Sequence, residues 1–391
     1  FLNLIEKIND SIKNHKENDI YKEIRTHINN TNEEFVQVLN KFALRYLFLK
    51  LYNKDDSRLE KLNINSYNKF VAATKENITY KCSTCEEELK YMSSDIRPVF
   101  MEERIVLSIL LNKDLTESNI WNGSGNRYII DGDRTDIKIS ELVNNKNSKN
   151  KIKKIKEKIS ESNKKVNFSN FIENNKEHFK TLDKEAIENI EKTKTIFEGR
   201  KKIVSFSGGK DSTVVSDLVT RAYNTKKIIH VFGDTTMEFP FTYDYVERIK
   251  SRPNHPPFFD VDTVDETAMV LDDYDKEESQ FFQLSKKFGP PSRVMSWCCS
   301  IFKTGPIGNL FRQIADEHKI LTYYGIRRNE SNSRSKYDKI SPRPKISKQL
   351  VASPIIDWHD ADIWLYLLST GIDFNNAYRY GFRRVGCIYC P

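Results

Sequence analysis

The sequence contains no long apolar run and no visible signal peptide. Nowhere do its 391 residues approach the roughly 20 apolar positions that a membrane-spanning helix requires. Together with the absence of a secretory signal, this predicts a cytoplasmic protein with no membrane partner. Because the chain begins at Phe1 rather than Met and stops at Pro391, directly after a cysteine pair, we expect the natural protein to extend beyond these ends.

Cysteine is scarce, and its distribution is uneven. The six cysteines form three close pairs, Cys82/Cys85, Cys298/Cys299 and Cys387/Cys390. In a chain without an export signal, such pairs favour metal binding over disulfide bonds. All six are therefore candidate metal ligands.

The remaining composition is that of an ordinary soluble protein. Hydrophobic residues make up 38% and charged residues 30%, and the length suffices for two or three domains. The net charge of +8 permits a polyanionic partner such as nucleic acid but does not require one.

The most informative segment is KKIVSFSGGKDST, residues 201–213. It predicts a buried strand over 203–206, a glycine-containing turn over 207–212 and a helix from about Thr213. Paired glycines allow positive φ and close backbone approach, so the turn directs N–H groups and a helix N-terminus at an anion. The spacing of a Walker loop is absent. The candidate ATP and phosphate ligands here are Ser205, Ser207, Gly208, Gly209, Lys210, Asp211, Ser212 and Thr213.

The string Ser207-Gly-Gly-Lys-Asp-Ser212 resembles the PP-loop of the ATP pyrophosphatase superfamily. The resemblance implies an enzyme that binds ATP, cleaves it between the α and β phosphates and passes AMP to an acceptor. It also implies that Lys210 and the loop amides stabilise the departing pyrophosphate. Mg²⁺ would bridge phosphate oxygens, with Asp211 or Asp234 as its ligand.

The chain divides by composition into four parts. Residues 1–80 predict a helical N-terminal region. Residues 81–140 resemble a degenerate zinc-ribbon and PUA-like module, with a hairpin turn at Asp131-Gly132; such modules often contact RNA. Residues 141–200 predict a Lys-rich helical linker, whose lysines either form a solvated face or contact phosphates. Residues 201–391 form the PP-loop catalytic domain.

The catalytic part alternates strand and helix patterns. Strands are predicted at 203–206, 228–232, 258–261, 321–324 and 350–352, with helices between them at 213–223, 243–251 and 307–318. The fold class is therefore α/β, a doubly wound, mostly parallel sheet of the adenine nucleotide α-hydrolase type. Ligands of such sheets bind at the carboxyl ends of the strands.

Three further motifs resemble the phosphoadenosine phosphosulfate (PAPS) reductase branch of the superfamily. The D-T-T-M-E-F-P string places Asp234 after the second strand, as a magnesium ligand or a ribose acceptor. The G-I-R-R-N-E-S string supplies Arg327 and Arg328, which with Arg334 would clamp phosphate or sulfate. In D-W-H-D-A-D-I-W the tryptophans are predicted packing anchors, and Asp357 a helix cap.

The tandem Cys298-Cys299 pair and the distant Cys387-x-x-Cys390 pair resemble the ligand set of the iron–sulfur members of this branch. Adjacent thiolates suit a [4Fe–4S] cubane better than one zinc ion, although zinc and free thiols stay open. Cys82 and Cys85 form either half of a Zn²⁺ site or a degenerate ribbon.

Two departures from sulfate reductases shape the functional prediction. Those enzymes have a degraded loop and use a mobile C-terminal cysteine, whereas this chain keeps the full S-G-G-K-D-S and shows no such cysteine. The leading hypothesis is an ATP pyrophosphatase that activates nucleic acid (DNA phosphorothioation or tRNA thiolation), with a cysteine desulfurase as sulfur donor and a possible homo- or hetero-oligomer as the working form. The alternatives are an adenylyl-sulfate or PAPS reductase, and a nucleic-acid-binding subunit with structural ATP.

Overall fold

The computed structural model describes residues 96–123, 125–137, 148–261, 275, 278–291, 297–314, 320–331, 334–341, 346 and 349–388. All of these lie within one compact unit, 80–391. The predicted N-terminal helices of 1–80 lie outside the described residues, as do Cys82, Cys85 and Cys390. No helix in the described ranges is long and apolar enough to cross a membrane.

A small antiparallel sheet comes first in the described chain. Its strands are β1 (Arg97–Pro98), β2 (Ile120–Asn122), β3 (Arg127–Ile130) and β4 (Asp133–Asp136), in the order β1-β2-β3-β4. Helix α5 (Met101–Leu111) adds Leu107 to the core of this module. The predicted hairpin turn is confirmed, because Asp131 and Gly132 both have positive φ, 51° and 91°, as a type I′ turn requires.

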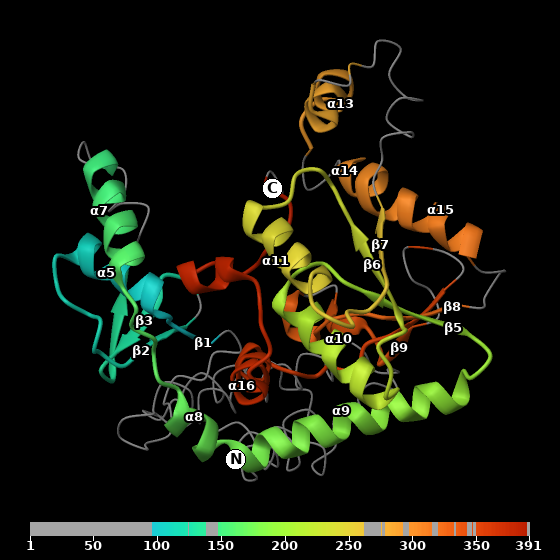
Figure 1. Cartoon of the computed structure of the whole chain (residues 1–391), viewed down its shortest axis with the longest axis horizontal. Coiled ribbons are helices and arrows are strands. Elements are labelled where there is room, and N and C mark those ends of the chain that lie inside the picture. Colours follow the sequence, from blue (N-terminus) through green and yellow to red (C-terminus); the bar gives the residue numbers. More distant parts are fainter. Residues whose placement is uncertain are drawn as a thin grey trace, which may run out of the picture. The chain divides into compact units, whose positions relative to one another are not determined.

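Three helices follow: α7 (Ser148–Glu161), α8 (Ser169–Asn174) and α9 (Lys176–Ile196). Six of the 14 residues of α7 are lysines, and four of these are exposed: Lys153, Lys154, Lys156 and Lys158. Helix α9, the long green helix in Figure 1, is amphipathic. Its Leu182, Ala186 and Ile190 are buried in the largest hydrophobic core. The Lys-rich stretch therefore ends in a helix that belongs to the core of the α/β half.

The α/β half is built on a six-stranded sheet. Its order is β7-β6-β5-β8-β10-β9, and every pair except the last is parallel. The predicted doubly wound sheet is thus confirmed, with the short β9 closing one edge. The strands are β5 (Lys201–Ser205), β6 (Ile229–Gly233), β7 (Phe258–Val261), β8 (Ile320–Tyr323), β9 (Ile340–Ser341) and β10 (Gln349–Ala352).

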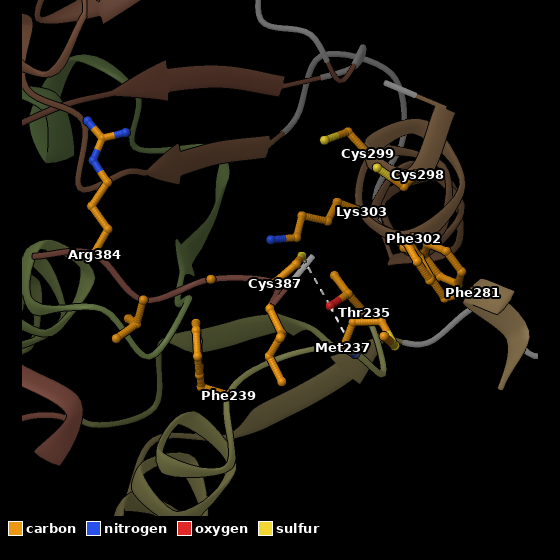
Figure 2. Close-up of a pocket in the computed structure, with 13 residues that line it drawn as sticks. Thr235, Met237, Phe239, Phe281, Cys298, Cys299, Phe302, Lys303, Arg384 and Cys387 are labelled. Carbon is orange, nitrogen blue, oxygen red and sulfur yellow. Dashed lines mark hydrogen bonds between the residues drawn. The ribbon is translucent and has the colours of Figure 1, made fainter. Parts of the chain in front are cut away.

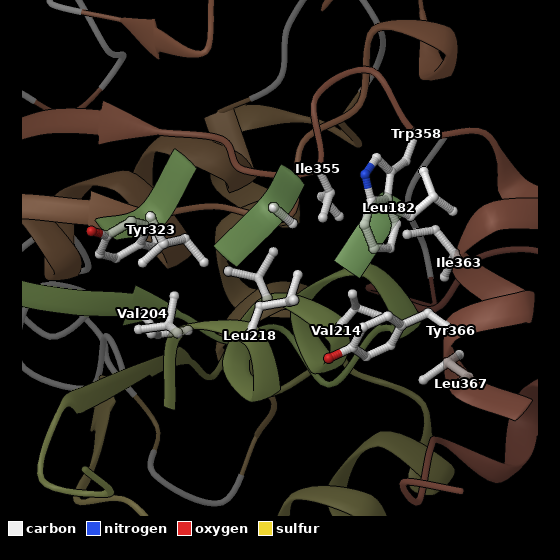
Figure 3. Close-up of a cluster of buried hydrophobic side chains, with 14 of the residues drawn as sticks. Leu182, Val204, Val214, Leu218, Tyr323, Ile355, Trp358, Ile363, Tyr366 and Leu367 are labelled. Atoms are coloured by element: carbon white, nitrogen blue, oxygen red, sulfur yellow. The ribbon is translucent and has the colours of Figure 1, made fainter. Parts of the chain in front are cut away.

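Helices pack on both faces of this sheet because successive strand residues point to opposite sides. Val204 joins a core with α9, α10 (Lys210–Ala222) and α16 (Asp360–Thr370), part of which is drawn in Figure 3. Its neighbour Ile203 packs with Phe311 of α15 (Gly305–Ile314) on the other face. The remaining helices are α11 (Pro240–Lys250), α13 (Gln280–Phe288) and α14 (Trp297–Cys299), the π-helix η2 (Ser300–Thr304), and the 3₁₀ helices η3 (Arg328–Glu330), η4 (Arg334–Lys336) and η5 (Asn376–Tyr380).

Two sequence predictions need correction. Helix α10 begins at Lys210, not at Thr213, because Gly209 already has the extended conformation of an N-cap and accepts the Thr213 N–H at 3.0 Å. Asp357 does not cap α16. The N-cap is His359, whose backbone N–H donates to Asp362 at 2.7 Å. The predicted packing role of the tryptophans is confirmed, since Trp358 and Trp364 are both buried in the main core.

The strand order reverses between β5 and β8. The chain winds from β5 through β6 to β7, and then returns to the other side of β5 for β8 and β10. In a doubly wound sheet, the crevice at the carboxyl ends of the two strands at such a switch point is the usual ligand site. The phosphate loop follows β5 and the arginine-containing loop follows β8, so both emerge at this point.

Candidate active site

The phosphate loop is a tight turn whose shape depends on its glycines. Gly208 has φ +70°, and a Cβ there would lie 2.8 Å from the Thr242 side chain. A side chain at this position would be both strained and crowded. Within the turn, the Ser212 hydroxyl accepts the Ser207 N–H at 3.2 Å and donates to the Gly209 carbonyl at 2.9 Å. These bonds shape the backbone that leads into the N-terminus of α10.

Four charged side chains form a closed set at the start of α10, which we call the four-charge cluster: Lys210, Asp211, Arg327 and Asp360. The Lys210 ammonium lies 3.0 Å from Asp211 and 3.2 Å from Asp360. The Arg327 guanidinium donates to the same two carboxylates, at 2.6 Å and 2.5 Å. Two cations and two anions therefore alternate, and their formal charges cancel.

Burial makes this pairing necessary. By itself burial would lower the pKa of Lys210, but Asp211 and Asp360 outweigh it, and the pKa is raised. Burial would likewise raise the pKa of Asp211, yet Lys210 and Arg327 hold that pKa below its usual value. Both groups thus keep their charges at neutral pH, since a buried charge is tolerated only when it is paired.

The loop after β8 reaches the cluster because Gly325 has no side chain. A Cβ on Gly325 would lie 2.7 Å from the Asp211 carbonyl carbon and 2.8 Å from the Ser212 nitrogen. Both of these atoms belong to the backbone of α10 and cannot rotate away. The glycine therefore permits the close approach that brings Arg327, two residues later, to Asp211 and Asp360.

A C-terminal segment holds the phosphate loop from the other side. The Tyr378 hydroxyl accepts the Lys210 N–H at 3.0 Å, and burial raises the pKa of this hydroxyl to about 12. The Asn375 side-chain amide donates to the Gly208 carbonyl at 3.2 Å. The loop is thus fixed by residues about 170 positions downstream.

The predicted phosphate ligands differ in their exposure and in their hydrogen-bond partners. The Ser207 side chain is exposed and meets the Ser212 hydroxyl at 3.2 Å. Thr213 is buried and its hydroxyl contacts that of Tyr245 at 2.8 Å. The Ser205 side chain hydrogen-bonds Tyr324.

The predicted arginines and Asp234 have separate partners. Arg328 pairs with Asp357, and Arg334 with Glu330, so these two do not join Arg327 in the four-charge cluster. Asp234 lies beyond β6, where its carboxylate accepts the Thr236 N–H at 2.7 Å and the Tyr243 hydroxyl at 2.8 Å.

Three cysteines that are far apart in the sequence line one cavity of about 480 Å³ (Figure 2). Cys298 and Cys299 come from α14, and Cys387 from the C-terminal segment, 387 − 299 = 88 positions later. Cys387 is held by a bridge to Glu238, and the Ile388 N–H donates to the Met237 carbonyl at 2.7 Å. All three are free thiols. We call this space the cysteine cavity.

The wall of the cysteine cavity combines aromatic rings with a partly exposed lysine, Lys303, that pairs with the buried Glu238. Phe281 and Phe302 line it, and Figure 2 shows Lys303 pointing toward Cys387. The Lys303 ammonium lies 3.4 Å from Glu238. Burial raises the pKa of the Cys387 thiol, an effect that Lys303 opposes.

The donor chemistry of this cavity suits iron. Thiolates are the ligands of iron–sulfur clusters, and three thiols converge on one space. Within the described ranges, however, no three or more His, Cys, Asp or Glu side chains are grouped so that they could hold a metal ion. Cys390, the fourth predicted ligand, lies outside those ranges.

The cysteine cavity and the phosphate loop share a wall. Val385 lines the cavity, and its side chain would lie 3.5 Å from a Cβ placed on Gly209. Thr235 and Met237, from the D-T-T-M-E-F-P string, also line the cavity. Part of this string therefore lies at the thiols.

Two important residues of the site have no predicted role, although one of them, Asp360, lies within the D-W-H-D-A-D-I-W string. Asp360 and Tyr378 both contact Lys210, yet neither is among the predicted site residues. The sequence gives at most a weak signal for Asp360, because an acidic residue in the first turn of a helix is common. No comparable signal marks Tyr378, whose partner is a backbone group.

Comparison with known proteins places the α/β half among sulfur-related proteins. Residues 201–391 match the model of the phosphoadenosine phosphosulfate reductase domain. An uncharacterised protein of Methanocaldococcus jannaschii is 32% identical over 200 residues, which cover 51% of this chain and 38% of that protein. The adenosine 5′-phosphosulfate reductase of Shouchella clausii is 26% identical over 192 residues, 49% of this chain and 71% of that enzyme.

Among solved structures, the PAPS reductase of Candida auris in its phosphate complex is similar, with 17% identity and a TM-score of 0.39 over 55% of this chain and 96% of that chain. The present chain spans well under half of the Methanocaldococcus protein. The matching segment begins at β5 and contains the phosphate loop, the loop after β8 and the described cysteines. Residues 201–391 thus match the phosphoadenosine phosphosulfate reductase domain family.

Proposed function

We propose that the chain is an AMP-forming ATP pyrophosphatase that activates an acceptor for sulfur transfer. The observation that carries this proposal is the wall shared by an intact S-G-G-K-D-S phosphate loop and a cavity lined by three thiols. Splitting ATP requires the loop, and sulfur chemistry requires thiols or a thiolate-bound cofactor. A protein that only reduced adenylated sulfate would have no use for a loop that binds a leaving pyrophosphate.

In this proposal the loop binds the β and γ phosphates of ATP. The turn at Gly208 and Gly209 directs backbone N–H groups at the phosphates, and the exposed Ser207 adds a hydroxyl. Lys210 and Arg327 supply the positive charge that stabilises pyrophosphate as it leaves. Mg²⁺ accompanies the nucleotide, with the Asp211 or Asp234 carboxylate as its protein ligand.

We assign the cysteine cavity to a [4Fe–4S] cluster held by Cys298, Cys299, Cys387 and Cys390. A bound cluster supplies a fixed electrostatic environment beside the site of sulfur delivery. Phe281 and Phe302 would shield a bound cluster from water, and Lys303 would keep a positive charge next to Cys387.

The proposed acceptor is nucleic acid, either DNA or tRNA, with a cysteine desulfurase as the sulfur donor. Two features support it: the net charge of +8 and the exposed lysines of α7. Lysines along one helix bind phosphates without reading sequence. Comparing cellular nucleic acids with and without this gene by mass spectrometry identifies the acceptor, through loss of a thiolated nucleoside or of a phosphorothioate linkage.

The activity is tested by incubating the full chain with ATP, Mg²⁺, nucleic acid and sulfide, which displaces AMP from the activated acceptor, and measuring AMP and pyrophosphate. We expect both products in equal amounts from the wild type. Lys210→Ala should release pyrophosphate at least tenfold more slowly, because one preorganised charge at a leaving group is worth about that much or more. Lys250→Ala, which removes a lysine paired with Asp260 outside the site, is the matched control. Release by Lys210→Ala at the wild-type rate would refute the assignment of the loop.

A reductase of adenylated sulfate is the second candidate, and the family match together with the named reductase of Shouchella clausii favours it. The two functions differ in what they consume. Sulfite released from adenylyl sulfate or PAPS in the presence of thioredoxin, with no consumption of ATP, would establish the reductase. AMP and pyrophosphate formed from ATP, without sulfite, would establish the pyrophosphatase.

A further inference from the structure

Asp360 contacts the two cations of the phosphate site from a different helix, α16. Lys210 and Asp211 are neighbours in the first turn of α10, whereas Asp360 is the first residue of α16, 150 positions away. Its carboxylate contacts both cations, Lys210 at 3.2 Å and Arg327 at 2.5 Å. The N-terminus of α16 stabilises its negative charge.

The four-charge cluster is neutral as it stands. The side chains of Lys210 and Arg327 are only 4% and 5% exposed, whereas those of Asp211 and Asp360 are 15% and 12% exposed. An approaching phosphate therefore meets two carboxylates before it reaches either cation. To bind Lys210 and Arg327, it has to replace an anion that already holds them.

We propose that Asp360 is an internal counter-ion that competes with the pyrophosphate group for Lys210 and Arg327, and so sets how tightly the product is held. This inference rests on the proposed function. Asp211 cannot have the same role, because it lies in the helix turn that carries Lys210 and moves with it. Asp360 belongs to another helix, α16, and pairs again with Lys210 and Arg327 when pyrophosphate leaves.

The competition has a consequence for turnover. A site with two unopposed cations would bind pyrophosphate tightly and release it slowly, whereas a returning carboxylate weakens the product complex. Asp360 is thus a positioning residue: it touches neither the substrate nor the reacting phosphorus, and it acts through Lys210 and Arg327.

The test is titration calorimetry of the full chain with Mg²⁺ and inorganic pyrophosphate. Asp360→Asn keeps the size of the side chain and an oxygen that accepts from Arg327, but removes the negative charge. We expect it to bind pyrophosphate at least tenfold more tightly, because one negative charge a few ångströms from a phosphate is worth more than a factor of ten at a dielectric constant of about 20. In steady state it should lower KM for ATP and kcat together, with pyrophosphate a stronger product inhibitor.

Two further variants keep the result interpretable. Asp360→Glu retains the charge and should bind pyrophosphate within threefold of the wild type. Asp373→Asn removes a carboxylate that also pairs with two arginines, Arg248 and Arg252, outside the site, and should leave the affinity unchanged. A purely structural role for Asp360 would instead weaken binding in proportion to lost stability, which thermal unfolding of each variant reports.

Affinity of Asp360→Asn equal to or weaker than the wild type overturns the inference, as does equally tight binding by Asp360→Glu. Because binding is measured without turnover, a chain that gives the expected order of affinities but never cleaves ATP refutes the proposed function and supports the inference. A wild-type chain that binds no pyrophosphate overturns both.

Discussion

Replacing Gly325 by alanine tests whether the approach of the β8 loop to α10 builds the phosphate site. The added Cβ would lie 2.7 Å from the Asp211 carbonyl carbon, 2.8 Å from its oxygen and 2.8 Å from the Ser212 nitrogen. Normal contacts of carbon with these atoms exceed 3 Å, and backbone atoms cannot turn aside. Either the loop or the helix start must shift by several tenths of an ångström.

The size of the effect follows from this crowding. Forcing an extra methyl into a packed site costs about 1–3 kcal/mol of stability. The shift also separates Arg327 from Asp211, a contact of 2.6 Å. We therefore expect Gly325→Ala to lower the free energy of unfolding in urea by about 2 kcal/mol and to slow AMP formation at least tenfold.

Gly308→Ala is the matched control. Gly308 lies within α15, where the nearest atom to an added Cβ would be Ile346 Cγ2 at a comfortable 3.8 Å. Alanine favours the helix over glycine by up to about 1 kcal/mol, so this variant should be at least as stable as the wild type. If Gly325→Ala unfolds at the same urea concentration as the wild type and keeps its rate of AMP formation, the close approach does not build the site.

Two further predictions concern buried polar groups. Burial lowers the pKa of His230 to about 4, so the unfolded chain binds a proton at a higher pH than the folded chain does. The free energy of unfolding should therefore drop by about 2 kcal/mol between pH 7.5 and pH 5. Urea unfolding of His230→Gln should show a smaller drop. Equal pH dependence in the two proteins would contradict this. Tyr378→Phe removes the acceptor of the Lys210 N–H and should cost about 1–3 kcal/mol in the same assay. Tyr380→Phe, at an exposed position, should change little, and similar losses in both variants would argue against a special role for Tyr378.

The sequence predicts the sheet well because its strands are apolar and short, and because helical patterns separate them. The strand at 258–261 has the predicted bounds, and the other strands differ by one or two residues. The start of α10 is wrong by three positions, since Gly208 completes the turn alone and leaves Lys210 free to enter the helix. The sequence shows which positions are glycine and so allow positive φ, but not at which residue the turn ends and the helix begins.

The site itself is predicted only in part. The sequence identifies Lys210 and Arg327, because motifs mark them, and it pairs Cys298 and Cys299 with Cys387, which line one cavity. It cannot show that Arg328 and Arg334 turn to Asp357 and Glu330 instead of a shared phosphate position. Such choices depend on which carboxylate lies within reach of a long side chain, a property of the fold and not of local sequence.

The segment from Tyr378 to Cys387 has a mechanical consequence. At one end the Tyr378 hydroxyl accepts the N–H of Lys210, the first residue of α10. At the other end the backbone of Cys387 pairs with that of Glu238. Nine peptide units join these two contacts. Val385, which lies between them, lines the cysteine cavity and lies next to Gly209 of the phosphate loop. A ligand that draws the Lys210 N–H away from Tyr378 therefore acts on the same stretch of chain that carries Cys387. In the proposed function, this one stretch of backbone would link the nucleotide site to the site of sulfur chemistry.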